Sequence, residues 1–172
     1  MFDFKNKYYL ENDGYARIYY YFGTDTDLVI PSTIDGHIVK YLGSIPGGRV
    51  PTSHTDITSV TVPDTVTEIS KKSFAGCKTL TTVHLPDSLE VIENGTFSYC
   101  ENLTSINIPN SLKVIGDEAF RNCKKLTSVT LPDSVTTIGE SAFSGCALTT
   151  INIPDNIKSI DNWAFYECNI TK

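Results

Sequence analysis

The sequence lacks a long apolar run. No segment approaches the roughly 18 consecutive apolar residues that a transmembrane helix needs, and the opening stretch MFDFKNKYYLENDG contains no core for a signal peptide. We therefore expect no membrane insertion. If the chain as given is complete, the same observation predicts a cytoplasmic protein.

An excess of basic residues is also missing. The chain has 14 Lys and Arg against 20 Asp and Glu, for a net charge of −6, and the basic residues are scattered. Nucleic-acid binding depends on clustered Lys and Arg that neutralise phosphates, so no nucleic-acid partner is expected. A hydrophobic content of 40% with 20% charged residues is typical of one globular domain.

Metal-binding and catalytic patterns are absent as well. Metal sites usually show paired spacings such as C-x₂-C, and none occurs here. The three histidines, His37, His54 and His84, stand at unrelated places in the sequence and cannot form a recurrent partner for the cysteines. We therefore expect no metal, no cofactor and no enzymatic activity.

What the sequence does contain is a repeat. A proline follows each of five apolar runs, at Pro63, Pro86, Pro109, Pro132 and Pro154, with steps of 23, 23, 23 and 22 residues. Internal periods of 20 to 50 residues are typical of solenoids, in which each repeat forms one coil. Such coils cannot fold singly, because only stacking on a neighbour buries their apolar faces.

One repeat, LTSVTLPDSVTTIGESAFSGC at 126–146, shows how each coil is expected to fold. Val129 and Leu131 alternate with Ser128 and Thr130, the period of two that marks a half-buried strand. Pro132 ends this strand because it has no N–H for a ladder. The GESAF stretch is long enough for about one helical or 3₁₀ turn.

The five cysteines recur once per repeat, each three residues after a phenylalanine: Cys77, Cys100, Cys123, Cys146 and Cys168. In a solenoid they form a column with neighbours about 5 Å apart, close enough for a disulfide between coils. Five thiols cannot all pair, however, and a column offers no unique partner. We expect a buried ladder of reduced thiols; one or two disulfides are the alternative.

The N-terminal part is rich in tyrosine, with seven of nine tyrosines in the first 41 residues. Asp13-Gly14 lies between two strand-like runs, a strong hairpin signal. Residues 1–27 are predicted to form a hairpin cap over the first coil. The alternative is that the rings stack on glycans or peptides.

The repeat at 126–146 has the pattern LxxVxLPDSVxxIGxxAFxxC, with near copies at 80–100 and 103–123, and this pattern closely resembles the BspA-like leucine-rich repeat. The resemblance implies a leucine-rich-repeat solenoid of short parallel β-strands joined by short helical or 3₁₀ turns. Residues 57–172 would hold repeats of 22–23 residues, and residues 28–56 a degenerate first repeat with an irregular loop at 45–56. Such proteins bind other macromolecules, often at the surface of bacteria or protozoa, so the resemblance implies a cell-surface or secreted, non-enzymatic binding protein.

The leading functional hypothesis is a protein-binding module, with cell adhesion or host interaction as its role. Small polar side chains on the outward strand positions would make a flat hydrogen-bonding surface for an extended partner, without a pocket. These positions are Ser59, Thr61, Thr82, His84, Ser105, Asn107, Ser128, Thr130, Thr150 and Asn152. The alternative is a carbohydrate-binding adhesin that uses the tyrosine cluster, Tyr19 to Tyr21 in particular.

The single tryptophan lies in the last repeat. Trp163 occupies the position held by Lys72, Gly95, Glu118 and Ser141 in earlier repeats, all of which tolerate solvent. An exposed indole there is expected either to fold over the end of the last coil as a lid or to contact another chain. The second reading predicts a homodimer through the C-terminal end.

Overall fold

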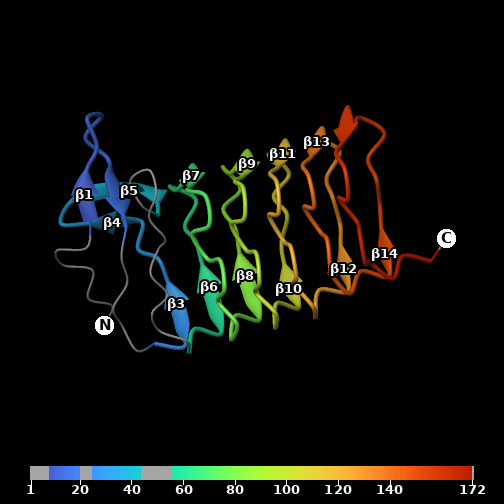
Figure 1. Ribbon diagram of the computed structural model, residues 1–172. Helices are drawn as coiled ribbons and strands as arrows, with labels where there is room; N and C mark the ends of the chain where they lie inside the picture. The colour runs from blue at the N-terminus through green and yellow to red at the C-terminus, as the bar shows by residue number, and fades with distance from the viewer. Residues whose placement is uncertain (1–7, 20–24, 44–55, 172) are drawn as a thin grey trace.

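The protein, seen in a computed structural model that describes residues 8–19, 25–43 and 56–171, is a β-solenoid. Figure 1 shows the coils stacked along one axis, from the N-terminal hairpin to the C-terminus at the opposite end. The N-terminal strands are β1 (Tyr8–Leu10), β2 (Ala16–Ile18), β3 (Asp27–Val29), β4 (Thr33–Ile34) and β5 (His37–Leu42). The repeats then contribute β6 (Ser59–Thr61), β7 (Glu68–Ile69), β8 (Thr82–His84), β9 (Val91–Ile92), β10 (Ser105–Ile106), β11 (Val114–Ile115), β12 (Ser128–Val129), β13 (Thr137–Ile138), β14 (Thr150–Ile151) and β15 (Ser159–Ile160).

The first wall of the solenoid, here called the strand face, consists of β3, β6, β8, β10, β12 and β14. Except between β10 and β12, its neighbouring strands pair in parallel, and equivalent residues of successive repeats face each other, as Ser59 and Thr82 do in β6 and β8. Each strand ends before the proline of its repeat, as predicted. The apolar residue between the two outward positions points into the core, where Val60 and Val83 are buried.

The second wall contains β9, β11, β13 and β15, again paired in parallel. Nearer the N-terminus it continues as β7, β5, β2 and β1. β1 and β2 form the predicted antiparallel hairpin around Asp13-Gly14, with Leu10 opposite Ala16. The hydroxyl of Tyr41 in β5 donates to the Asp13 carboxylate in the hairpin turn, and this bond raises the pKa of Tyr41 to about 12.

The third wall, the turn wall, comprises residues 72–77, 95–100, 118–123, 141–146 and 163–168. Alternate N–H groups donate to the next coil, for example Phe74 to the Thr96 carbonyl at 2.9 Å and Phe97 to Ala119 at 2.8 Å. The N–H groups between them bond to a carbonyl three residues back in the same coil. This wall thus adds a third hydrogen-bonded ladder along the solenoid.

Here the structure corrects the prediction of a helical or 3₁₀ turn. Each coil has two residues with positive φ on this wall, and no helix occurs in the described part of the chain. The first of these residues has φ between 54° and 65° at Lys72, Gly95, Glu118, Ser141 and Trp163. A left-handed residue ends a right-handed helical turn, and most of these residues have a side chain, so the neighbouring coil must hold them in place.

A column of stacked phenylalanine rings fills the core behind the turn wall. The rings of Phe74, Phe97, Phe120, Phe143 and Phe165 lie with centroids 5.1–5.6 Å apart and planes within 13° of parallel. The first four are buried. Offset stacking of this kind adds to the stabilisation from burial alone.

The cysteines form a second column beside the rings. All five lie in the described residues and are thiols that form no disulfide. Each Sγ–H from Cys100 onward donates to a phenylalanine carbonyl of the preceding coil, as Cys123 does to Phe97 at 3.3 Å and Cys146 to Phe120 at 3.0 Å. A hydrogen bond with Cys77, followed by burial, raises the pKa of Cys100 well above its usual value. The Cys100 thiol therefore stays protonated at neutral pH, and the thiols from Cys100 onward act as structural donors.

Candidate functional site: a cleft in the strand face

The strand face is interrupted between β10 and β12. The two strands lie on successive coils (Figure 1), yet β10 ends one four-stranded sheet and β12 begins a separate two-stranded sheet. On either side of the break the coils are joined by backbone hydrogen bonds, from Thr104 N–H to Thr81 and from Thr149 N–H to Thr127. Among the described residues, the corresponding bond from Thr127 to Thr104 is not formed. The carbonyl of Thr104 and the N–H of Thr127 are therefore left open to a partner at this one step of the strand-face ladder.

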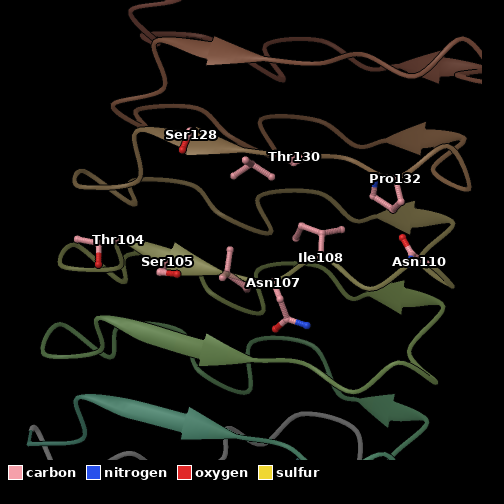
Figure 2. A pocket seen from close by; sticks show the side chains of 10 residues that line it. Thr104, Ser105, Asn107, Ile108, Asn110, Ser128, Thr130 and Pro132 are labelled. Atoms are coloured by element: carbon pink, nitrogen blue, oxygen red, sulfur yellow. The ribbon is translucent and has the colours of Figure 1, made fainter.

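A cleft of about 390 Å³ lies over this break. Figure 2 shows its lining side chains on the two neighbouring coils, with Ser105 and Asn107 on one side and Ser128 and Thr130 on the other. Thr104, Ile108, Asn110 and Pro132 are the other labelled side chains of the lining. The sequence predicted a surface without a pocket, and in this respect the prediction is wrong.

The apolar floor of the cleft is more exposed than the same positions of the β8 and β12 coils on either side. Val83 and Leu85 of the second full repeat are buried, with 1% and 5% of their surface exposed. Their counterparts in the next coil, Ile106 and Ile108, are only half-buried. The cleft thus combines hydroxyl and amide groups at the rim with aliphatic surface below.

The ten side chains that the sequence assigned to the outward strand positions are all exposed or half-buried. The structure brings four of them together around the cleft, namely Ser105, Asn107, Ser128 and Thr130. The other six lie along the strand face outside it: Ser59, Thr61, Thr82, His84, Thr150 and Asn152. Their role in binding stays a prediction.

Three of these residues also hold the fold together. The Asn107 amide bonds to both backbone groups of Leu85, and the Asn152 amide does the same to Leu131. Ser59 donates to the Asp27 carboxylate at 2.8 Å. Only part of the hydrogen-bonding capacity predicted for the strand face is therefore available to a ligand.

Sequence reasoning missed the remaining lining residues, of which Thr104, Ile106 and Ile108 form the edge of the broken ladder. The pair Ile106 and Ile108 differs from the Val and Leu of the flanking repeats, but Ile151 and Ile153 show the same difference while β14 pairs normally with β12. No signal in the repeat would have found this position.

The lining contains no charged side chain. In residues 8–19, 25–43 and 56–171 there is no group of three His, Cys, Asp or Glu side chains that could hold a metal ion. The described residues also include no helix with the length and apolarity to cross a membrane. The chemistry that the cleft offers is hydrogen bonding by neutral groups over an apolar floor.

The alternative site in the tyrosine cluster can be followed only in part. Tyr20 and Tyr21 lie outside the described residues, and Tyr19 is half-buried.

Trp163 lies on the turn wall of the last coil, where 64% of its surface is exposed. Ile160 stays 43% exposed in the same coil, so the indole does not cover the coil end and the lid interpretation is wrong. A contact of Trp163 with another chain stays a prediction.

A family model for the BspA type leucine-rich repeat region matches residues 52–171 in six copies. The chain belongs to the BspA type leucine-rich repeat family. This confirms the resemblance read from the repeat. The search of curated proteins found no match.

Solved structures of other leucine-rich repeat proteins have the same fold. The leucine-rich repeat protein of T. pallidum is 33% identical with a TM-score of 0.85, over 98% of this chain and 77% of that one. A leucine-rich repeat protein from Bacteroides ovatus is 31% identical with a TM-score of 0.78, over 90% of this chain and 41% of that one. The pneumococcal vaccine antigen PcpA, 22% identical with a TM-score of 0.59 over 91% of this chain and 50% of that one, shares the fold alone.

Proposed function

We propose that this BspA type leucine-rich repeat protein is a non-enzymatic binding module that holds an extended segment of a protein partner on its strand face. The observation that carries the proposal is the break between β10 and β12, with its cleft of about 390 Å³. The other steps of the described strand face, from β3 to β10 and from β12 to β14, are closed by paired strands.

An extended peptide suits this site for two reasons. The Thr104 carbonyl and the Thr127 N–H can bond to the main chain of a partner, as in strand addition to a sheet edge. The rim hydroxyls and amides can bond to polar side chains, while Ile106 and Ile108 accept an apolar one. The lack of charge in the lining favours a neutral segment.

The finer part of the proposal concerns biological role. We place this binding at a cell surface, where it would attach the protein to a host protein. Membership of the BspA type family supports this role, as does the shared fold with a vaccine antigen.

A displayed library of random peptides, selected against the full chain, tests the binding site. We expect selected peptides to bind the wild type saturably and to lose at least tenfold in affinity with Thr130→Arg, which places a long cation in the cleft. Thr61→Arg is the matched control, because Thr61 has the same register on β6 but lies outside the cleft, and it should leave the affinity unchanged.

Failure to select any saturable peptide, or equal losses in both variants, would contradict the site. The adhesive role has a separate test, in which the chain is applied to immobilised host extracellular proteins. Saturable binding that the selected peptide blocks is the expected result. Absence of binding to every protein of the panel contradicts the role without contradicting the peptide site.

A further inference from the structure

The turn wall carries a groove of its own near the C-terminal end. It has a volume of about 480 Å³ and lies on a different wall from the strand-face cleft. Arg121 and Asn122 line it from the third full coil, Trp163 and Tyr166 from the fifth, and Ser141 and Ser144 from the coil between them. Three successive coils therefore build this groove.

The groove exists because of side-chain size. The fourth coil has serine at both of its lining positions, whereas the flanking coils have long or aromatic side chains there. The coils are close-packed, with centroid distances of 5.1 Å from Phe120 to Phe143 and 5.6 Å from Phe143 to Phe165. The two sides of the groove thus stand two coil steps apart, with the serines as the floor.

One side of the groove is lined by aromatic residues that the fold does not require. Trp163 is 64% exposed and Tyr166 is 55% exposed, so neither contributes much to the core. The corresponding residues of earlier coils are polar or small: Lys72, Gly95, Glu118 and Ser141 for Trp163, and Ala75, Ser98, Arg121 and Ser144 for Tyr166. Exposed aromatic rings that the scaffold does not use indicate a binding surface.

The opposite side supplies a charged donor. The Arg121 guanidinium bonds to the Glu118 carboxylate at 2.7 Å. Glu167 lies in the same groove and provides an acceptor of opposite charge. The serine hydroxyls and the Asn122 amide add neutral hydrogen-bonding groups.

We propose that this groove binds a neutral saccharide. The apolar C–H face of a pyranose ring would stack on Trp163 and Tyr166, and its hydroxyl groups would bond to Arg121 and Glu167. A strongly acidic or basic ligand fits less well, because the groove carries one charge of each sign. The site is independent of the proposed peptide site, since no residue lines both.

The single tryptophan of the chain makes the groove directly observable, because all tryptophan fluorescence comes from Trp163. The full chain is titrated with four neutral hexasaccharides: cellohexaose, maltohexaose, chitohexaose and mannohexaose. We expect a saturable change in Trp163 emission with at least one of them. Calorimetry on the same sugar should then give at least a tenfold lower affinity for Trp163→Ala and for Tyr166→Ala.

Tyr99→Ala is the matched control. Tyr99 is 44% exposed on the same wall but lies outside the groove, so its removal should leave the affinity unchanged. Thermal unfolding of each variant verifies that it is folded, and Tyr166→Phe, which keeps the ring, should retain most of the affinity.

Several outcomes overturn the proposal. One is the absence of any saturable fluorescence or heat change with the four sugars. Another is equal affinity of wild type, Trp163→Ala and Tyr166→Ala. A third is Trp163 emission that depends on protein concentration and not on sugar, which would assign the groove to a contact between two copies of the chain.

Discussion

The side-chain amide of Asn107 bonds to the backbone of Leu85 as a paired strand would. Its Oδ1 accepts a hydrogen bond from the Leu85 N–H at 2.7 Å, and its Nδ2 donates to the Leu85 carbonyl at 3.0 Å. The amide therefore joins two coils just beyond the point where β8 and β10 stop pairing. The same residue also lines the strand-face cleft, so it contributes to both the scaffold and the candidate site.

We expect Asn107→Ala to lower the free energy of unfolding by about 1 to 2 kcal/mol, since two intramolecular hydrogen bonds are lost at about 1 kcal/mol each. Thr130→Ala, at the same register in the next repeat, removes an exposed side chain and should change stability by less than about 0.5 kcal/mol. Urea unfolding of both variants gives the comparison. Equal stabilities would mean that the Asn107 amide does not join the coils in solution.

Phe120→Ala should be among the most destabilising single substitutions. Phe120 is fully buried between Phe97 and Phe143, at 5.5 and 5.1 Å between ring centroids, and truncating such a ring costs about 3 to 5 kcal/mol. Phe165→Ala is the control, because Phe165 stacks on one ring only and is half-buried. A loss at Phe165 as large as that at Phe120 would contradict the stacked core.

Thiol titration tests the cysteine column. In denaturant without reductant we expect five reactive thiols, one for each cysteine. In the native protein Cys168 should react first, because it is half-buried while the other four are buried. Three or one reactive thiols in denaturant would show that disulfides form after all.

The reaction of native Cys168 should also depend on pH. Burial raises the pKa of this thiol to about 11, and only the thiolate reacts. The rate should therefore rise about tenfold per pH unit between neutral pH and the pKa, and Cys168→Ser should abolish this phase. A rate that levels off near the usual cysteine pKa of about 8.5 would show that Cys168 is exposed.

Much of the scaffold could be predicted from the repeat. The regular prolines predict where strands of the strand face end, and the alternation around Val129 predicts which side chains point inward. These signals are local and recur in every coil, so each repeat confirms the others. The hairpin at Asp13-Gly14 was equally predictable, because its turn chemistry is contained in neighbouring residues.

The turn wall could not be predicted in the same way. Its left-handed residues include Lys72, Glu118 and Trp163, whose side chains disfavour positive φ when considered singly. They adopt it because alternate N–H groups bond to the next coil, a tertiary effect that no single repeat contains. A local reading of the same stretch therefore gave a helical or 3₁₀ turn.

Only part of the candidate cleft could be predicted from the sequence. Ser105, Asn107, Ser128 and Thr130 follow from the strand alternation, whereas the break in pairing between β10 and β12 does not. That break depends on how the two successive coils pack against each other, which no single repeat contains. Flat surfaces can thus be inferred from the repeat, but an irregularity between two coils requires the structure.

Hydrogen exchange on the chain with and without its selected peptide tests the central claim most directly. We predict that the peptide slows amide exchange at 104–108 and 127–131, which flank the break, and leaves the turn wall at 163–168 unchanged. Protection confined to other walls, or no protection at either side of the break, would contradict a peptide-binding cleft between β10 and β12.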